Sequence, residues 1–175
     1  MSTILALTDE QIFNGLSAFA KKHLGGPDRV ITVRGFVGRV SKVKGPDYVL
    51  ITVMTQVPTS TTTHSYDADA GTITVTAPTQ KSVQVDCFGK KAEAWAKTLA
   101  ALLADEIGTA FLQDYGFAPL YVDNALDMTQ FDGREDFAAR WMIGCMVHRP
   151  ERVTTDQDFF DGVTMTIRTV QPGAQ

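Results

Sequence analysis

The sequence predicts an α+β fold, in which a mostly antiparallel sheet is packed by an N-terminal helix and one long central helix. Helical and strand patterns follow the order helix, several strands, long helix, two strands, without the regular alternation typical of a parallel sheet. Short, hairpin-like connections separate several of the expected strands. The 175 residues correspond to a single domain, 1–175, which can bury a sufficient core without a disulfide or a metal. We expect residues 170–175 to be frayed.

Composition places the chain among ordinary soluble globular proteins. Hydrophobic residues make up 44% and charged residues 21%, which excludes a disordered chain or a coiled coil. The net charge of -4 argues against nucleic acid as the main ligand. No apolar stretch approaches the ~18 residues of a membrane span, and the N-terminus lacks the basic residues of a secretory signal. Two cysteines, Cys87 and Cys145, fit a reducing compartment, so we expect a cytoplasmic setting.

A capping-box pattern predicts where the first helix begins. Thr8 is the expected N-cap, and Gln11 stands three residues later. Gly25-Gly26-Pro27 ends the helix. Its apolar positions recur at helical spacing and form one face: Ile12, Leu16, Phe19, Ala20 and Leu24.

Several strands are expected after this helix. Residues 29–37 are rich in β-branched side chains, and Gly35 indicates a bulge or an early end. Residues 48–57 form a nearly continuous apolar run, which is typical of a buried central strand. A turn at 66–71 joins two threonine-rich strands, and Gly71 supplies its positive φ.

The remaining elements are the longest helix and the strands around it. Residues 81–88 alternate as a strand, and Gly89 separates them from a helix over 90–112. Residues 137–148 and 163–170 alternate in the same way and predict the last two strands. The helix carries a broad apolar stripe, Ala92, Trp95, Ala96, Leu99, Leu102, Leu103, Ile107 and Phe111. We expect this stripe to be buried against the sheet face that carries Val83, Val85, Trp141 and Ile143.

Charge is segregated along the chain. Residues 1–64 hold seven basic and four acidic residues, whereas residues 65–175 hold nine basic and sixteen acidic residues. Two explanations stay open: solvated faces that simply differ, or head-to-tail self-association in which the basic part of one copy meets the acidic part of the next. The candidate interface residues are Arg39, Lys42 and Lys44 on the basic side, and Asp123, Asp127 and Asp132 on the acidic side.

Patterns that would indicate catalysis or metal binding are weak. Cys145 and His148 are three residues apart on one expected strand, so they face opposite sides and cannot form a thiolate–imidazole pair. The segment 67–71 resembles a calcium loop, but Pro78 stands where the bidentate glutamate is required, and a hairpin turn explains it better. No P-loop or glycine-rich dinucleotide motif occurs. We therefore expect no catalytic residue, no metal and no cofactor, and a small soluble enzyme is the less favoured class.

Four segments resemble the neck-terminator (tail-terminator) proteins of long-tailed bacteriophages. Together they span roughly residues 8–170, nearly the whole chain. The segments are Val33-Arg34-Gly35 with Arg39-Val40 and then Asp47-Tyr48-Val49; Ser82 to Gly89 with Ala92 and Trp95; Arg140-Trp141; and Asp158-Phe159-Phe160-Asp161 followed by Val163.

This resemblance implies a structural role without catalysis. Proteins of the family form a homo-hexameric ring that caps the tail tube beneath the head–tail connector, and genomic DNA passes through the ring without specific binding. The implied partners are other copies of the chain, the connector or adaptor protein and the tail tube protein, with no membrane. The implied location is the neck or tail of the virion, assembled in the host cytoplasm. Another connector or tail-tube subunit is the alternative within the same class.

Overall fold

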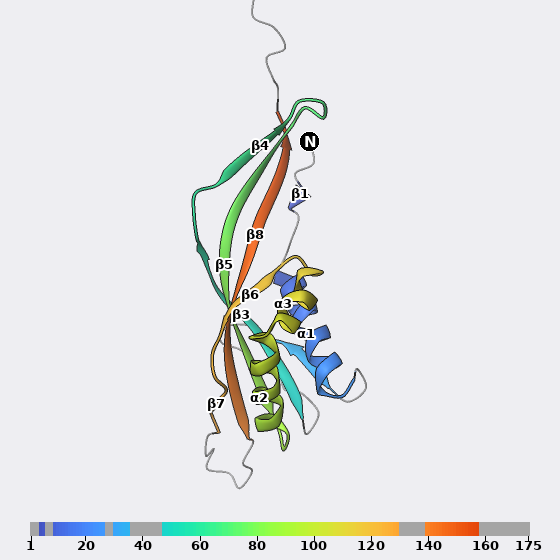
Figure 1. The fold of residues 1–175 in the computed structure, drawn as a ribbon, viewed down its shortest axis with the longest axis vertical. Helices are drawn as coiled ribbons and strands as arrows, with labels where there is room; N and C mark the ends of the chain where they lie inside the picture. Colours follow the sequence, from blue (N-terminus) through green and yellow to red (C-terminus); the bar gives the residue numbers. More distant parts are fainter. Residues whose placement is uncertain (1–3, 6–8, 27–29, 36–46, 130–138, 158–175) are drawn as a thin grey trace, which may run out of the picture.

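The computed structural model describes residues 4–5, 9–26, 30–35, 47–129 and 139–157. Within these residues, eight strands form one sheet and three helices lie on one of its faces, which confirms the α+β class (Figure 1). In chain order the elements are β1 (Ile4–Leu5), α1 (Asp9–Leu24), β2 (Ile31–Arg34), β3 (Tyr48–Pro58), β4 (Thr63–Asp67), β5 (Thr72–Phe88), α2 (Ala92–Leu103), α3 (Glu106–Gln113), β6 (Ala118–Val122), β7 (Leu126–Asp127) and β8 (Arg140–Asp156).

The sheet is mixed. Its main path is β1-β8-β5-β3-β2, with β4 also paired to β5, and β6 and β7 also paired to β8. Strands β2 and β3 are parallel, from Ile31 opposite Tyr48 to Arg34 opposite Ile51, while the other described pairs are antiparallel. A parallel pair needs a long crossover rather than a hairpin, and the thirteen residues 35–47 are long enough to provide one.

The single long helix predicted over 90–112 is wrong, because the chain breaks it into α2 and α3. Asp105 has extended backbone and its side chain accepts a hydrogen bond from Ile107 N at 3.1 Å, so it caps a new helix instead of continuing the old one. Gly108 then lies against the end of α2, where a Cβ would meet Leu102 O at 2.7 Å. The break turns Ile107 outward to 49% exposure, although the sequence pattern placed it in the core.

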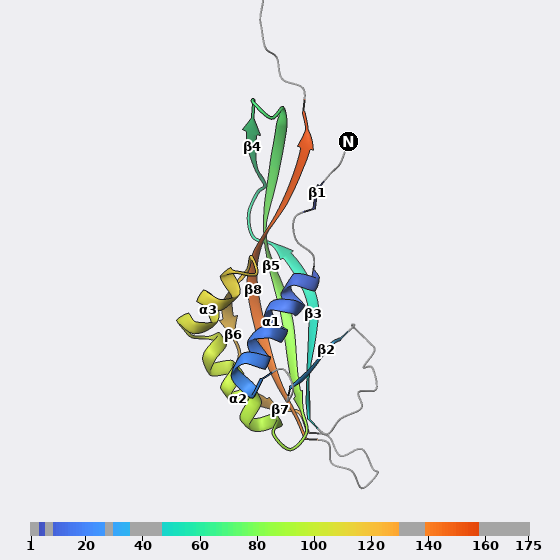
Figure 2. The ribbon, with the colours of Figure 1, turned by 90° about the vertical axis from the view of Figure 1, so that its right-hand side faces the viewer.

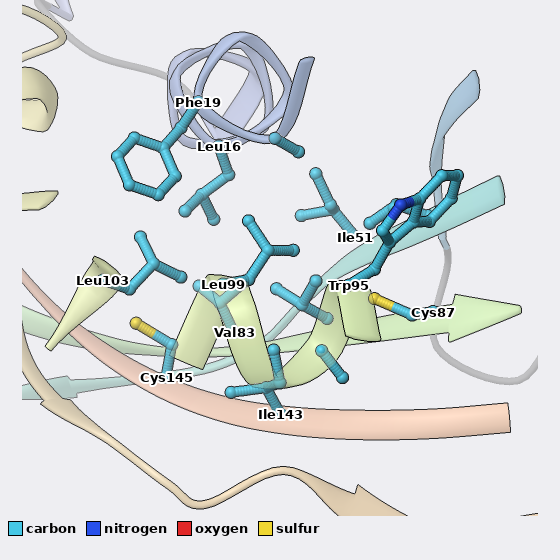
Figure 3. Packing of buried hydrophobic residues seen from close by; sticks show 14 of the residues in the cluster. Leu16, Phe19, Ile51, Val83, Cys87, Trp95, Leu99, Leu103, Ile143 and Cys145 are labelled. Atoms are coloured by element: carbon cyan, nitrogen blue, oxygen red, sulfur yellow. The ribbon is translucent and has the colours of Figure 1, made fainter. Parts of the chain in front are cut away.

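The core lies between the helices and one face of the sheet. The buried cluster joins α1 and α2 to the strands β3, β5 and β8 (Figure 3), with side chains that include Leu16, Phe19, Ile51, Val83, Leu99, Leu103 and Ile143. Within the described residues, the alternation expected for 81–88 and 137–148 is confirmed at six buried inward positions, Val83, Val85, Cys87, Ile143, Cys145 and Val147. Ala139 and Trp141, expected on the same face, are half-buried. Trp95 and Leu99 are buried as predicted, at 6% and 2% exposure, whereas Leu102 is half-buried.

Strands β5 and β8 are longer than the sequence patterns indicated, at 17 residues each. Pro78 and Pro150 sit opposite each other in the middle of this pair. Along the outer side of β5, strand β3 ends and strand β4 begins close to Pro78. Along the outer side of β8, strand β6 ends and strand β1 begins close to Pro150. A proline lacks the N–H that an outer neighbour would need, so both are tolerated at these gaps.

Beyond the two prolines the sheet continues past the helices as a projecting arm (Figures 1 and 2). The arm consists of β4, the first part of β5 (72–77), the last part of β8 (151–156) and β1. The turn predicted at 66–71 forms its tip, where Gly71 has φ of 62° and Asp67 Oδ1 accepts from Asp69 N and Ala70 N. The expected N-cap Thr8 and the expected strand 163–170 lie outside the described residues.

Candidate assembly surfaces

The two thiols are poorly suited to nucleophilic chemistry. Cys87 and Cys145 are buried among core side chains. Burial raises the pKa of each thiol, and the carboxylates of Asp86 and Asp123 contribute to the increase at Cys87 and Cys145, respectively, so that both pKa values are about 12. His148 lies on the opposite face of β8 from Cys145, as alternation requires. Both thiols are therefore protonated at neutral pH and act as core filler.

The described residues were also compared with the requirements of a metal site and of a membrane-spanning helix. Among them, no three His, Cys, Asp or Glu side chains gather as possible ligands. None of the described helices is long and apolar enough to cross a bilayer.

One side of the molecule, which we call the β6–β7 edge, exposes large apolar side chains. It consists of α3, β6 and β7, beside the outer side of β8. Half of the large hydrophobic residues that are exposed in the described chain lie here, namely Ile107, Leu120, Tyr121 and Leu126, at 49, 51, 65 and 51% exposure. Leu120 stands at a register shift in the β6–β8 pairing, which leaves it outside the regular ladder. Such a gathering marks a protein-contact surface more often than a scattered apolar residue does.

The same edge is acidic. Its exposed carboxylates are Asp105, Glu106, Asp114, Asp123 and Asp127. Asp123 is held by its backbone N–H, which donates to Gly144 O at 2.8 Å. Hydrogen bonds from the Thr129 side chain and backbone hold the pKa of Asp127 below its usual range. Asp127 is therefore charged at neutral pH.

Two hollows lie along this edge. The larger, about 370 Å³, is bounded by the alanine-rich end of α2 and the loop between β6 and β7, with Lys97 and Asp123 at its rim. The second, about 230 Å³, lies between Leu103, Thr109 and β6. Side chains of another protein can be received in both hollows.

The opposite edge of the sheet is β2. Ile31 is 43% exposed there and Arg34 is exposed at the end of the strand. The basic residues Arg39, Lys42 and Lys44 follow β2 in the sequence and lie outside the described residues. In the strand order β2-β3-β5-β8, with β6 and β7 beyond β8, the β2 edge and the β6–β7 edge are separated by the full width of the body.

The predicted interface residues are thus only partly placed. Asp123 and Asp127 are brought together on the β6–β7 edge, while Asp132 lies outside the described residues with the three basic candidates. Sequence reasoning missed the apolar part of the edge, because β6 and β7 are too short to alternate visibly. The two consecutive large apolar residues Leu120-Tyr121 were the feature of the sequence that could have indicated this apolar surface.

A buried charge cluster fixes the root of the arm. Lys81 Nζ lies 2.6 Å from Asp9 Oδ1 and 3.3 Å from Glu151 Oε1. Arg149 Nη1 lies 3.7 Å from the same Asp9 oxygen, and the Arg149 side chain is 1% exposed. The cluster joins β5 and β8 to the first turn of α1 at the root of the arm.

An elongated subunit with two unlike edges, a projecting arm and buried, protonated thiols defines a class of protein: a structural subunit built to assemble. The family described as phage neck terminator protein matches residues 11–171, so the chain belongs to that family. The family is one of structural phage proteins and not a class of enzymes.

Comparison of structures supports the fold. The chain is similar to a subunit in the structure titled "Cryo-EM Structure of an Extracellular Contractile Injection System, PVC sheath/tube terminator in extended state", with a TM-score of 0.57 and 12% identity. The match covers 98% of this chain and 66% of that one, so the present chain spans just under two thirds of its relative's length. No curated protein matches the sequence.

Proposed function

We propose that six copies of the protein form a closed ring that ends the tail tube and joins it to the head–tail connector. The observation that carries this proposal is the position of the two unlike edges on opposite sides of one sheet. A heterologous contact, edge to opposite edge, generates a ring when the rotation between copies closes. The tail tube protein and the connector or adaptor protein are the neighbours along the tail axis.

In this ring the β6–β7 edge of one copy meets the β2 edge and the following basic segment of the next. Ile107, Leu120, Tyr121 and Leu126 supply apolar area on one side. Asp123 and Asp127 face Arg39, Lys42 and Lys44 across the contact. Exposed ion pairs contribute only about 0–1 kcal/mol each, so they set the register while apolar burial supplies most of the adhesion.

The lumen of the ring passes genomic DNA without binding it. The net charge of -4 opposes a persistent contact with phosphates. Affinity for DNA grows with the number of phosphates that lysine and arginine neutralise, so an acidic or neutral lumen lets the duplex slide. Assembly takes place in the host cytoplasm, and the ring then remains at the neck of the virion.

A charge-swap experiment tests the edge-to-edge contact. Lys42→Glu with Lys44→Glu, or Asp123→Lys with Asp127→Lys, should each weaken ring formation measured by light scattering. The defect should be larger at low salt, because screening over roughly 8–10 Å near physiological ionic strength already weakens the native attraction. Combining all four changes should restore the ring. Unchanged oligomer mass in both double variants at both salt concentrations would remove the charge contact.

A further inference from the structure

One row of cross-strand partners runs across the whole width of the sheet. It begins at Val33 on β2 and ends at Leu126 on β7, and between them it contains Leu50, Asp86 and Met142 on β3, β5 and β8. Each member is the register partner of the next, so all five side chains lie on the same face of the sheet. The row therefore connects the β2 edge with the β6–β7 edge.

This row lies on the face that points away from the helices. Val85 and Cys87, on either side of Asp86 in β5, belong to the core beneath the helices, so Asp86 projects to the other face. There Arg140 Nε donates to Asp86 Oδ1 at 3.0 Å, and Gln84 Nε2 donates to Asp86 Oδ2 at 2.8 Å. The middle of the row is thus held by hydrogen bonds within the chain.

Both ends of the row present apolar side chains at the surface. Leu126 is 51% exposed on β7. On β2, Val33 is half-buried, and Ile31, two residues earlier on the same face, is 43% exposed. Exposed apolar side chains at both ends of one row match each other in chemistry and in their position along the strands.

The two ends cannot meet within one chain. From β2 through β3, β5 and β8 to β7 there are four strand spacings, about 19 Å at the usual distance between strands. When a second copy lies edge to edge with the first, the row that ends at Leu126 in one copy begins again at Val33 in the next. The same contact then repeats at every junction, as a head-to-tail ring requires.

We propose that Leu126 of each copy packs against Ile31 and Val33 of the next copy, on the face that points away from the helices. The inference rests on the proposed ring and deepens it, because it selects the face and the row at which the two edges meet. Asp127, the next residue of β7, is the register partner of Trp141 and lies on the helix side. Apolar and charged contacts therefore occupy opposite faces of the same edge.

Cysteine cross-linking tests this contact. Two double variants, Ile31→Cys with Leu126→Cys and Val33→Cys with Leu126→Cys, are assembled and then oxidised. A disulfide needs Cα atoms within about 7 Å of each other, so the introduced cysteines can be linked only between copies. At least one double variant should give a ladder of linked chains on a non-reducing gel. The native thiols give little background because both are buried.

Matched variants show whether the link is specific. Each single-cysteine variant should give no linked chains, because a head-to-tail contact does not bring a residue against its own copy. Val57→Cys with Leu126→Cys should give none either. Val57 is 55% exposed on β3 but lies about 20 Å along the strand from the row at Leu50. Links of equal yield in any of these controls would overturn the contact.

A charge pair tests the same contact without oxidation. Ile31→Lys and Leu126→Asp should each weaken ring formation by roughly tenfold or more, because a charge replaces apolar area at the contact. Each variant should keep the native midpoint of urea unfolding, since both side chains are exposed in the single chain. Combining the two changes should recover much of the lost assembly.

The outcomes separate this inference from the proposed ring. A ring of full mass that forms no link in either double variant would overturn the contact between Leu126 and β2 and leave the ring intact. Full assembly of both charge variants would do the same. Absence of a ring in the unmodified protein would overturn the ring and the contact together.

Discussion

Asp9 Oδ1 lies 2.6 Å from Lys81 Nζ, an ion pair that joins the first turn of α1 to the middle of β5. The Lys81 side chain is 6% exposed, and its remaining acidic contact is Glu151 at 3.3 Å. Asp9→Ala should therefore destabilise the fold by about 1–3 kcal/mol, because it leaves a buried ammonium with one partner in place of two. Urea unfolding measures this. A loss as small as that of an exposed substitution such as Glu93→Ala would show that the pair is not structural.

Arg149 should behave in the opposite way. Its buried guanidinium has no hydrogen-bond partner among the described residues and lies 3.7 Å from Asp9. Burial lowers the pKa of Arg149 in spite of Glu151 and Asp9. Replacing a buried charge with an apolar side chain of similar volume is often neutral or stabilising by about 1–4 kcal/mol. We therefore expect Arg149→Met to equal or exceed the native stability in the same assay. A loss above about 2 kcal/mol would mean that the guanidinium holds the arm in place.

The helix break predicts unequal costs for two residues of the same apolar stripe. Trp95 is 6% exposed in the core, so Trp95→Ala should cost about 3–5 kcal/mol. Ile107 is 49% exposed, so Ile107→Ala should cost less than about 1 kcal/mol in the monomer. Chemical denaturation compares the two directly. Equal losses would indicate one continuous helix with both side chains buried.

His23 should make the protein less stable in mild acid. Its ring packs on Phe19, 4.5 Å between centroids, and burial followed by the charge of Lys22 lowers its pKa from 6.5. The unfolded chain then binds a proton more readily than the folded one, so stability falls as pH drops through 6.5 toward the lower folded pKa. Between pH 7.5 and pH 5.5, the free energy of unfolding should decrease less for His23→Gln than for the native protein. Identical drops would mean that His23 does not titrate differently on folding.

The apolar part of the β6–β7 edge should matter for assembly and not for folding. Tyr121 is 65% exposed, so Tyr121→Ser should leave the free energy of unfolding within about 0.5 kcal/mol of the native value. The same change should weaken ring formation at least tenfold, since aromatic side chains dominate contact energies. Ala94→Ser, exposed on α2, serves as the control and should change neither quantity. Full assembly of the Tyr121 variant would remove this edge from the interface.

The elements found from sequence are those with long, regular patterns. Helix α1 and the inward positions of β5 and β8 follow directly from spacing, because burial on one face imposes a period on the chain. The break between α2 and α3 could not be predicted from the sequence, because Asp105 and Gly108 can both stand within a helix. Only the structure shows how closely Gly108 approaches the end of α2. Pro78 divided β5 in the sequence pattern, although a proline is harmless where no outer strand needs its N–H.

The proposed assembly surface was predictable only in part. Charge segregation pointed to Asp123 and Asp127, which do lie together on one edge. The apolar residues beside them belong to β6, a short strand with an irregular register, and their exposure depends on which strand they pair with. The arm could not be predicted from the sequence either. Only the pairing of β5 with β8 shows that both strands extend beyond the helices (Figure 2).

The central claim is that the chain closes into one ring of defined size. Native mass spectrometry of the purified protein, with negative-stain imaging of the same sample, tests it most directly. The account predicts a single assembled species at six times the chain mass of 19.1 kDa, seen as closed rings that do not stack. Open stacks of variable length would indicate a tail-tube subunit instead, and a protein that stays monomeric at every concentration would contradict the ring.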